Sequence, residues 1–322
     1  MKANTLASFL SMFLSILWHQ ATAQITVANL RTELRSNPIG IDVIAPRLSW
    51  QLQGSERSIR QEAYQVLVAS SQEKLDQNIG DFWDSGKQLS NNSTHVIYAG
   101  SALQSRMEVF WKVKVYTNKG ESSWSEPAGW TMGLLYYKDW TGRWIGFDQY
   151  FPSDNEKTGQ LAARYFRKEF TTTKQIKQAT AYVMGLGLYE LYLDGKKIGD
   201  QVLAPVPTDY TKNIKYNVLD VTQSLSAGKH AIGVILGNGR FYAMRQAKPY
   251  KVKTFGFPKL QMQLMLTYTD GSTEVIKTDD SWKGTTEGPI TANNEYDGED
   301  YDARKELTGW ANPGFNDKTW LK

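Results

Sequence analysis

Short segments in which apolar and polar residues alternate, each ended by a tight-turn signal, make up most of this sequence. In the first half they are rich in Val, Tyr, Trp and Thr, and the strand candidates are Arg47–Gln53, Ala63–Ser70, Val109–Thr117 and Gly129–Gly133. Turn signals occur at Asp84-Ser85-Gly86, Asn118-Lys119-Gly120 and Asp270-Gly271. One short helical turn is expected in this half, around Ser71–Ile79. Many short strands at this spacing predict an all-β protein built of sandwiches, not a doubly wound α/β sheet.

The first 23 residues have the pattern of a secretory signal peptide. Lys2 supplies a positive start, Leu6–Trp18 is an apolar run too short to span a bilayer, and Ala21-Thr22-Ala23 suits signal peptidase. We therefore predict cleavage before Gln24 and export of the mature chain to the periplasm or the extracellular space. No cysteine lies near the cleavage point, so a lipoprotein anchor is not expected. No later stretch is long and apolar enough to predict a membrane partner.

Composition removes several classes of function. Without cysteine, the chain has no thiol nucleophile, thiolate zinc site or iron–sulfur cluster. The only histidines are His19, in the signal, His95 and His230, so Ser-His-Asp catalysis and multi-histidine metal sites are not expected. His230, beside Gly228, is expected in a surface turn. A formal charge of +4 without a Lys/Arg stripe does not indicate a nucleic-acid partner. The 11 Trp and 17 Tyr residues can fill sandwich cores or stack on sugar rings.

Residues 24–136 are predicted to form the first sandwich. In "VFWKVKVYTNKGESSWSEPAGWTMG", Phe110 and Lys112 fall on one face of a strand, and Trp111, Val113 and Val115 fall on the other. This arrangement resembles a fibronectin type III-like or immunoglobulin-like module, and such modules usually act as spacers.

Residues 137–322 are predicted to form a second sandwich, a jelly roll of the galactose-binding-like kind. "ARYFRKEFT" alternates, with Tyr165, Arg167 and Glu169 on one face. "YELYLDGKKIG" predicts a hairpin that turns at Asp194-Gly195, and "LQMQLMLTYTDGSTEVIKTDDSWKG" predicts another that turns at Asp270-Gly271. Between them, "DVTQSLSAGKHAIGVIL" predicts a loop that leads into a strong strand.

Several separated motifs of the second half occur together in one known family. "AYVMGLGLYELYLDGKKIGDQVLAP", "TDYTKNIKYNVLDVTQSLSAGKHAIGVILGNGRFY" and "YDGEDYDAR" resemble the N-terminal jelly-roll domain of bacterial α-L-rhamnosidases, glycoside hydrolase family 78. "APRLSW", "AYQVLVASS" and "FWDSGK" resemble the module that often precedes it. The resemblance covers about Ile25 to Lys322. It implies an enzyme that removes terminal rhamnose from glycans, with rhamnose-containing glycans as partners.

In that family, hydrolysis takes place in an (α/α)₆ barrel after the jelly roll, by an inverting mechanism with one acid and one base. Residues 24–322 show none of the long helical periodicity that such a barrel requires. We therefore expect no catalytic residue in this chain and a catalytic barrel, as an intramolecular partner, beyond residue 322. The alternative is a stand-alone carbohydrate-binding module, or a structural spacer or adhesion protein.

The acidic segment "NEYDGEDYDAR", Asn294 to Arg304, allows three interpretations: the paired carboxyls of a glycosidase, a calcium loop, or an acidic turn that joins two strands. If the backbone is extended, Glu295, Asp297 and Glu299 share one face. Gly298 is expected to break the strand, however, and an open strand does not supply the pocket that raises the pKa of a catalytic acid. These three carboxylates remain candidates for contact with a carbohydrate or with another domain.

A calcium ion is a further possibility for this segment, with Asp297, Glu299 and Asp300 as weak candidate ligands; no other cofactor is expected. The order of ligands does not match an EF-hand loop. Asp302 and Arg304 can form a charge-assisted pair that fixes the loop.

The second candidate site is "LGNGRFYAMR", Leu236 to Arg245, where a strand ends in Gly-Asn-Gly. Asn238 and Arg240 offer planar hydrogen-bond donors suited to vicinal hydroxyls, and Tyr242 offers a stacking face. The alternative is a bulge or loop that packs within the protein. Asp209, in the proline-bounded loop "APVPTDYTKN", is a further candidate beside this site.

Overall fold

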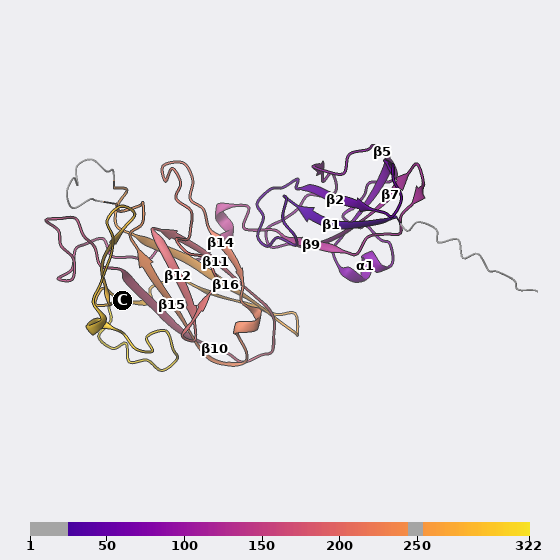
Figure 1. The fold of residues 1–322 in the computed structure, drawn as a ribbon. Coiled ribbons are helices and arrows are strands. Elements are labelled where there is room, and N and C mark those ends of the chain that lie inside the picture. The colour runs from indigo at the N-terminus through magenta and orange to yellow at the C-terminus, as the bar shows by residue number, and fades with distance from the viewer. Residues whose placement is uncertain (1–24, 244–253) are drawn as a thin grey trace, which may run out of the picture. The chain divides into compact units, whose positions relative to one another are not determined.

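A computed structural model describes residues 25–243 and 254–322, and the chain in these ranges is almost entirely β. The expected signal peptide, residues 1–23, and the end of "LGNGRFYAMR", Met244 and Arg245, lie outside the described residues. The described residues divide into two compact units: 25–37, 45–101 and 109–129 form the first, and 38–44, 102–108, 130–243 and 254–322 form the second. The predicted all-β fold class is confirmed (Figure 1).

The first unit contains two antiparallel sheets. One has the order β1-β2-β6, with β1 Thr26–Thr32, β2 Arg47–Gln53 and β6 Val96–Ile97. The other has the order β4-β3-β7-β8, with β4 Trp83–Asp84, β3 Gln61–Ala69, β7 Glu108–Thr117 and β8 Gly120–Glu121. At its edges, β5 Gln88–Leu89 pairs with β3 and β9 Ala128–Thr131 pairs with β7. A short α-helix, α1, spans Gln72–Asp76 within the predicted helical turn around Ser71–Ile79, and the Ser71 side chain caps its N-terminus.

Both faces of the sheet that contains β7 are covered in this unit. Trp111, Val113 and Val115, which the sequence placed on one face of this strand, are fully buried. The opposite face is covered too, because Lys112 is buried and its ammonium donates to the carbonyl of Leu75 and to Oδ1 of Asn78, at 2.7 Å. Burial lowers the pKa of Lys112. A lysine on a strand therefore does not mark a solvated face here.

The second unit is a sandwich of two larger antiparallel sheets (Figure 1). The five-stranded sheet has the order β13-β12-β15-β10-β18, with β13 Lys196–Ile198, β12 Leu188–Leu193, β15 Gly228–Gly237, β10 Arg164–Thr172 and β18 Lys283–Thr285. The four-stranded sheet has the order β14-β11-β16-β17, with β14 Asn217–Asp220, β11 Ile176–Leu186, β16 Lys259–Tyr268 and β17 Thr273–Lys277. A separate hairpin is formed by β19 Ile290–Asn294 and β20 Gly298–Tyr301, and 3-10 turns occur at Tyr137–Asp139, Thr222–Ser224 and Ala303–Lys305.

The core of this unit lies between the two sheets, and strict alternation decides which side chains enter it. From β12, Tyr189, Leu191 and Leu193 face the core, so Leu188 and Glu190 face outward from the five-stranded sheet. Both predicted Asp-Gly hairpins are confirmed, with Leu193 paired to Lys196 and Thr267 paired to Thr273. The positive φ of Gly195, 77°, and of Gly271, 83°, explains why glycine occupies these turns.

The C-terminal segment, Asp302–Lys322, covers part of the outer face of the five-stranded sheet. Arg167 is only 1% exposed on that face, and its guanidinium donates to the carbonyl of Trp310 at 2.9 Å and to the carboxylate of Asp317. Gly233 leaves room for the indole, because a Cβ there would lie 2.6 Å from Trp310. This segment is therefore part of the sandwich.

One expectation from the sequence was wrong. His230 is not in a surface turn but within β15, where it is 5% exposed and hydrogen-bonded to Asp194 at 2.6 Å and to the carbonyl of Ser226 at 2.8 Å. The adjacent Gly228-Lys229 suggested a turn, whereas the strand begins at Gly228. In the described ranges, no helix has the length and apolar character needed to cross a bilayer.

Candidate functional site

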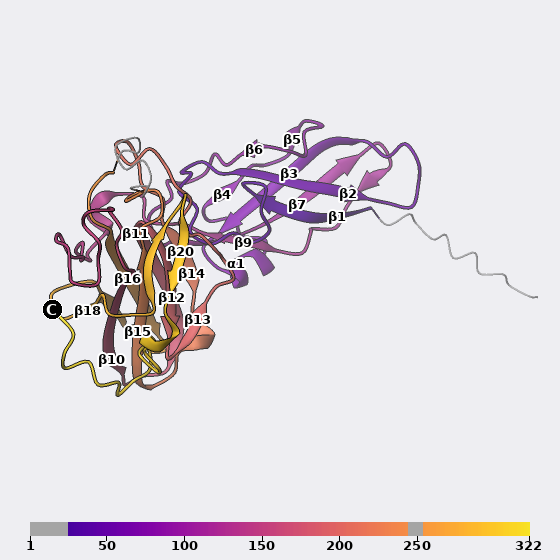
Figure 2. The ribbon, with the colours of Figure 1, turned by 60° about the vertical axis from the view of Figure 1, so that its left-hand side comes forward.

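The β19–β20 hairpin runs along the outer face of the five-stranded sheet (Figure 2). Between the hairpin and this face lies a groove. Its volume is about 400 Å³, within the range of small-ligand sites. We call it the hairpin groove. It is lined by Ala163, Leu188, Tyr189, Glu190, Leu203, Ile235, Gly237, Gly239, Ile290, Asn293, Asn294, Gly298 and Glu299.

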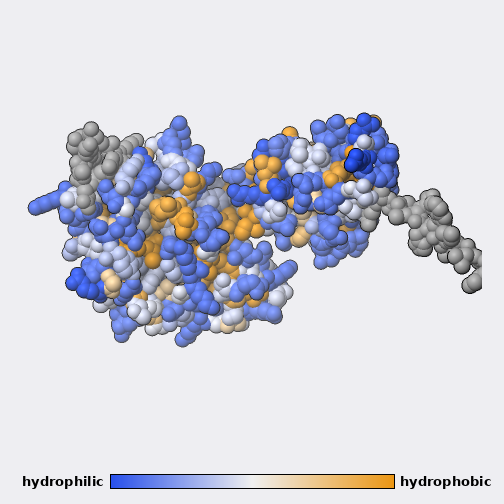
Figure 3. Space-filling view, in the orientation of Figure 1, coloured by the Kyte–Doolittle hydropathy of each residue, from blue (hydrophilic) through white to orange (hydrophobic). Residues whose placement is uncertain are grey.

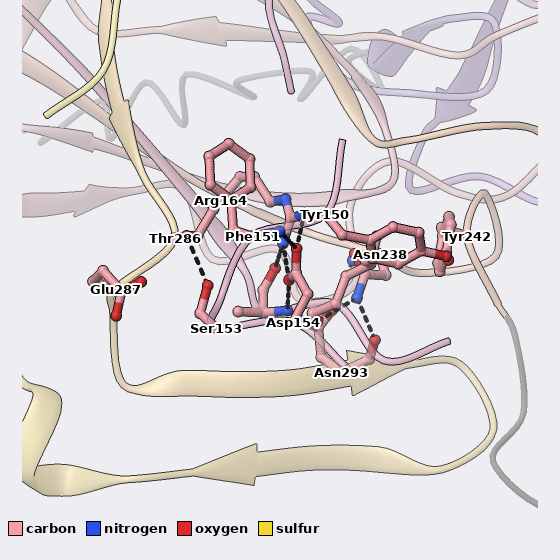
Figure 4. A network of polar contacts seen from close by, with 12 residues as sticks. Tyr150, Phe151, Ser153, Asp154, Arg164, Asn238, Tyr242, Thr286, Glu287 and Asn293 are labelled. Carbon is pink, nitrogen blue, oxygen red and sulfur yellow. Dashed lines mark hydrogen bonds and ion pairs between the residues drawn. The ribbon is translucent and has the colours of Figure 1, made fainter. Parts of the chain in front are cut away.

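Backbone and amide hydrogen bonds hold the hairpin over the sheet. The amide of Ala163 donates to the carbonyl of Ile290 at 3.0 Å. The backbone N–H of Asn238 donates to Oδ1 of Asn293 at 2.6 Å, and its Nδ2 donates to the Asn293 carbonyl at 2.7 Å (Figure 4). Gly237 permits this approach, since a Cβ there would lie 2.8 Å from Oδ1 of Asn293. The position of the groove wall is therefore fixed by the end of β15.

Beside the groove, the loop before β10 is held by a buried ion pair. Asp154 and Arg164, whose side chains are 0% and 1% exposed, are joined by two hydrogen bonds of 2.7 and 2.8 Å (Figure 4). Asp154 also accepts from the amides of Phe151 and Ala162, each at 2.9 Å. A carboxylate with four donors is well compensated for its burial. The pair fixes the segment that leads to Ala163 at the groove.

Two carboxylates line the groove, and their environments differ. Partial burial raises the pKa of Glu190, but hydrogen bonds from Lys197 and from the hydroxyl of Tyr192, at 2.7 Å, outweigh it, so its pKa is lowered. Loss of hydration, together with the charge of Glu190, raises the pKa of Glu299. The two side chains reach the groove from different elements, β12 and β20.

The acidic segment "NEYDGEDYDAR" forms the turn and second strand of the hairpin, which is the third of the three interpretations. Glu295 and Asp297 lie in the turn, where Oδ1 of Asn294 accepts from the amide of Asp297 at 2.9 Å. Gly298, with a φ of 82°, ends the turn, so the extended arrangement of Glu295, Asp297 and Glu299 does not form. Of these three, Glu299 alone lines the groove.

The pair predicted at the end of this segment is present. Arg304 donates from Nε and Nη2 to the two oxygens of Asp302, both at 2.8 Å, and lowers the pKa of Asp302 to about 2. The calcium candidates Asp297, Glu299 and Asp300 lie in the turn and in the second strand of the hairpin. Within residues 25–243 and 254–322, no group of three or more His, Asp or Glu side chains is placed to hold a metal ion.

The residues of "LGNGRFY" divide between packing and surface. Asn238 is 1% exposed, and its amide also donates to the carbonyl of Leu161 at 2.8 Å. Tyr242 is buried, stacked on Phe257 and hydrogen-bonded to the hydroxyl of Tyr150 at 2.6 Å. The hypothesis of sugar contact by Asn238 and Tyr242 conflicts with this burial, and loop packing, the alternative, describes both side chains.

Arg240 and Asp209 are more accessible than their neighbours. Nε of Arg240 lies 3.6 Å from Oε2 of Glu295, so these two sequence candidates, distant along the chain, do meet. Asp209 is exposed and accepts from the amide and hydroxyl of Thr211, which is a local turn contact. Its neighbour Tyr210 packs on Phe241, with ring centroids 5.2 Å apart, so the loop does lie beside this site.

Both halves of the chain match described domain families. Residues 174–322 match "Alpha-L-rhamnosidase N-terminal domain", and residues 27–136 match "Rha78A-like, N-terminal immunoglobulin domain". Two α-L-rhamnosidases, from Formosa agariphila and Alteromonas sp., are 38% and 37% identical over 89% and 88% of this chain. Each half of the chain therefore matches a domain of the N-terminal region of α-L-rhamnosidases.

Solved structures give the same result for the fold. An α-L-rhamnosidase from Dictyoglumus thermophilum superposes with a TM-score of 0.83 at 42% identity, over 93% of this chain and 34% of that one. A Streptomyces avermitilis α-L-rhamnosidase complexed with L-rhamnose matches with a TM-score of 0.81 at 26% identity, over 92% of this chain and 44% of that one. The chain spans about a third of the length of the curated relatives from Formosa and Alteromonas, 32% and 31%.

Sequence patterns did not indicate most of the residues that line the hairpin groove. Glu190 lies in "LYELYL", a strand with bulky residues on both faces. That pattern signals a strand covered on both sides, and it could have drawn attention to the outward-facing Leu188 and Glu190. Asn293, just before the acidic run, carried no recognisable signal because its role depends on the end of β15.

Proposed function

We propose that this chain is the accessory, substrate-recognition part of an exported α-L-rhamnosidase, which hydrolyses terminal α-L-rhamnose from glycans. The observation that carries the proposal is the match over 93% of this chain to 34% of the Dictyoglumus thermophilum enzyme. The L-rhamnose in the Streptomyces avermitilis structure supports the choice of sugar.

In this proposal, the chemistry belongs to an (α/α)₆ barrel that follows residue 322. A carboxylic acid there protonates the leaving oxygen, and a second carboxylate activates a water molecule on the opposite face of the sugar. The present chain contributes no catalytic residue. Its partners are rhamnose-containing glycans and the barrel of the same polypeptide, and residues 1–23 direct export.

The length and the activity of the native polypeptide in its source cells test the proposal. An antibody against residues 24–322 should detect a secreted or periplasmic protein about three times as long as this chain, since the chain covers 32% of its Formosa relative. Material isolated with that antibody should release L-rhamnose from an aryl α-L-rhamnoside. A polypeptide no heavier than this chain, which is 36.5 kDa before cleavage of the signal, or a long one without this activity, would refute the proposal.

The hairpin groove favours a binding role over the alternative of a structural spacer or adhesion protein, because a spacer needs no lined hollow. Titration of the chain with L-rhamnose, followed by Trp fluorescence, separates the two. The titration is repeated with calcium and with EDTA, which tests the sequence hypothesis for Asp297, Glu299 and Asp300. Unchanged fluorescence, together with the absence of a longer rhamnosidase polypeptide, would favour the spacer.

A further inference from the structure

The hairpin groove combines an apolar part with a polar part. Leu188 of β12 and Ile235 of β15 are contributed by the outer face of the sheet, and Ile290 is contributed by the hairpin. Leu203, which is 74% exposed, adds an apolar side chain from the loop after β13. Figure 3 shows that apolar surface interrupts the hydrophilic surface of this unit. The groove can therefore desolvate a methyl or C–H face of a ligand.

The polar part contains carboxylate hydrogen-bond acceptors and one amide donor that has no hydrogen-bond partner in the protein. Glu190 and Glu299 present carboxylate oxygens, which accept hydrogen bonds from hydroxyl groups. Asn293 also lines the groove, and among the described residues its buried amide nitrogen has no hydrogen-bond partner. An unsatisfied buried donor is unusual, and an oxygen atom of a ligand is a group that can accept its hydrogen bond.

The charge of the lining restricts the class of ligand. Neither lysine nor arginine lines the groove within the described ranges, and the nearby Lys197 is engaged by Glu190. Two carboxylates repel uronates, sulfates and phosphates. A metal ion is not favoured either, because the described residues form no group of three acidic or histidine ligands. A neutral polyhydroxylated ligand with an apolar edge remains.

We propose that the hairpin groove is a binding subsite for a neutral 6-deoxyhexose. Glu190 and Glu299 accept hydrogen bonds from ring hydroxyls, Asn293 donates to an oxygen, and the methyl group lies against Leu188 and Ile235. This inference rests on the proposed function, which supplies L-rhamnose, a 6-deoxyhexose, as the sugar. It adds the place on the chain at which the sugar is held.

The test is a titration of the full chain with L-rhamnose, followed by amide chemical shifts in ¹H–¹⁵N spectra. Glu299→Ala should weaken binding about tenfold, because a hydrogen bond to a charged acceptor is lost. Asp300→Ala is the matched control: it removes the same charge from the next residue of β20, whose side chain points to the opposite face. This control should change the affinity less than about twofold. Unchanged spectra of the free variants verify their fold.

Two further sugars test the chemistry of the subsite. L-mannose differs from L-rhamnose by a hydroxyl on the methyl group and should bind more weakly, because the apolar part leaves that hydroxyl without a partner. D-galacturonate should not bind, because of its charge. Equal binding of galacturonate would refute a site for neutral sugars.

The failure of this inference can be separated from failure of the proposed function. If L-rhamnose binds and Glu299→Ala does not weaken it, the groove is not the subsite, while the accessory role stands. If L-rhamnose does not bind at concentrations up to about 50 mM, its binding free energy is weaker than about −2 kcal/mol. The subsite is then refuted. The accessory role is then decided by the length and activity of the native polypeptide.

Discussion

A single buried carboxylate, Asp154, holds the loop that leads to the groove. Its side chain is 0% exposed and accepts two hydrogen bonds from Arg164 and two from backbone amides. Asp154→Ala leaves the guanidinium buried without its counterion. We expect the free energy of unfolding to fall by about 3–5 kcal/mol, measured by urea denaturation.

The matched control is Asp280→Ala. Asp280 also pairs with an arginine, Arg143, at 3.0 Å, but the two side chains are 89% and 72% exposed. Exposed pairs contribute little, so this substitution should change stability by less than about 1 kcal/mol. Equal losses for Asp154→Ala and Asp280→Ala would contradict the importance of burial.

Glu299 makes a second residue-scale prediction, which concerns pH. Its pKa is raised above the ordinary value of 4.5 by loss of hydration and by Glu190. Between the unfolded and the folded pKa, the native state binds more protons than the unfolded state, so stability falls as pH rises through that window. Glu299→Gln removes this effect. The variant should therefore melt at a higher temperature than the parent at pH 7, and the difference should vanish below about pH 4.

A second variant tests whether the charge of Glu190 contributes to the raised pKa of Glu299. In a Glu190→Gln background, the gain from Glu299→Gln at pH 7 should be smaller, since the charge of Glu190 contributes to the raised pKa. A gain that is independent of pH would show that packing of the glutamine, not proton linkage, stabilises the hairpin.

At the scale of elements, the sequence predicts the strands and turns whose structure depends on neighbouring residues. The span of β2, Arg47–Gln53, and the turns at Gly195 and Gly271 were predicted correctly because alternation and turn geometry depend on neighbouring residues. The coverage of Arg167 by Asp317 was not predicted, since it joins residues 150 positions apart.

The candidate site was less predictable than the fold for the same reason. The acidic segment was correctly recognised as a possible turn between strands, from Gly298 and the run of polar residues. Burial of Tyr242 could not be derived, because it depends on Tyr150 and Phe257 from other segments. Glu190 was overlooked because a lone acid on a strand normally faces water.

The two Asp-Gly hairpins allow an element-scale test. Gly195 and Gly271 have similar φ values, 77° and 83°, so alanine should cost about 1–2 kcal/mol of backbone strain at each. A Cβ at Gly271 meets nothing within 4 Å, whereas one at Gly195 overlaps Oδ1 of Asn312 in the C-terminal segment. We therefore expect Gly195→Ala to lower the unfolding free energy more than Gly271→Ala in urea titrations.

A double substitution tests whether contact with Asn312 causes the larger loss of unfolding free energy expected for Gly195→Ala. Asn312→Ala removes the overlapping side chain, so Gly195→Ala in that background should cost about as much as Gly271→Ala does alone. An excess that persists would place the strain in the turn itself, and not in its contact with the C-terminal segment.

At the scale of the whole molecule, the chain contains two units with separate cores, around Trp50 and Trp111 in the first and around Leu191 and Ile232 in the second. Two compact units of this size can unfold as separate cooperative transitions. Substitutions and truncations in one unit are therefore expected to alter one transition. This makes the contribution of the C-terminal segment measurable within the full chain.

Truncation after Tyr301 is expected to abolish the transition of the second unit. It uncovers the Arg167 guanidinium and removes the hydrogen bonds that this guanidinium donates to Trp310, Asn312 and Asp317, at a cost of about 1.5–3 kcal/mol each. It also uncovers Tyr165 and Gly233 by removing Trp310, at a further cost of about 2–3 kcal/mol. Together these losses match most of the about 5–15 kcal/mol that stabilises a domain.

Calorimetry and limited proteolysis of the truncated chain test this. The transition of the first unit should keep its midpoint, while the second unit should lose its transition and become sensitive to protease. Asp317→Ala, which keeps Trp310 in place, should only lower the second midpoint. If the truncated chain instead keeps both transitions, the segment Asp302–Lys322 lies on the sheet without stabilising it.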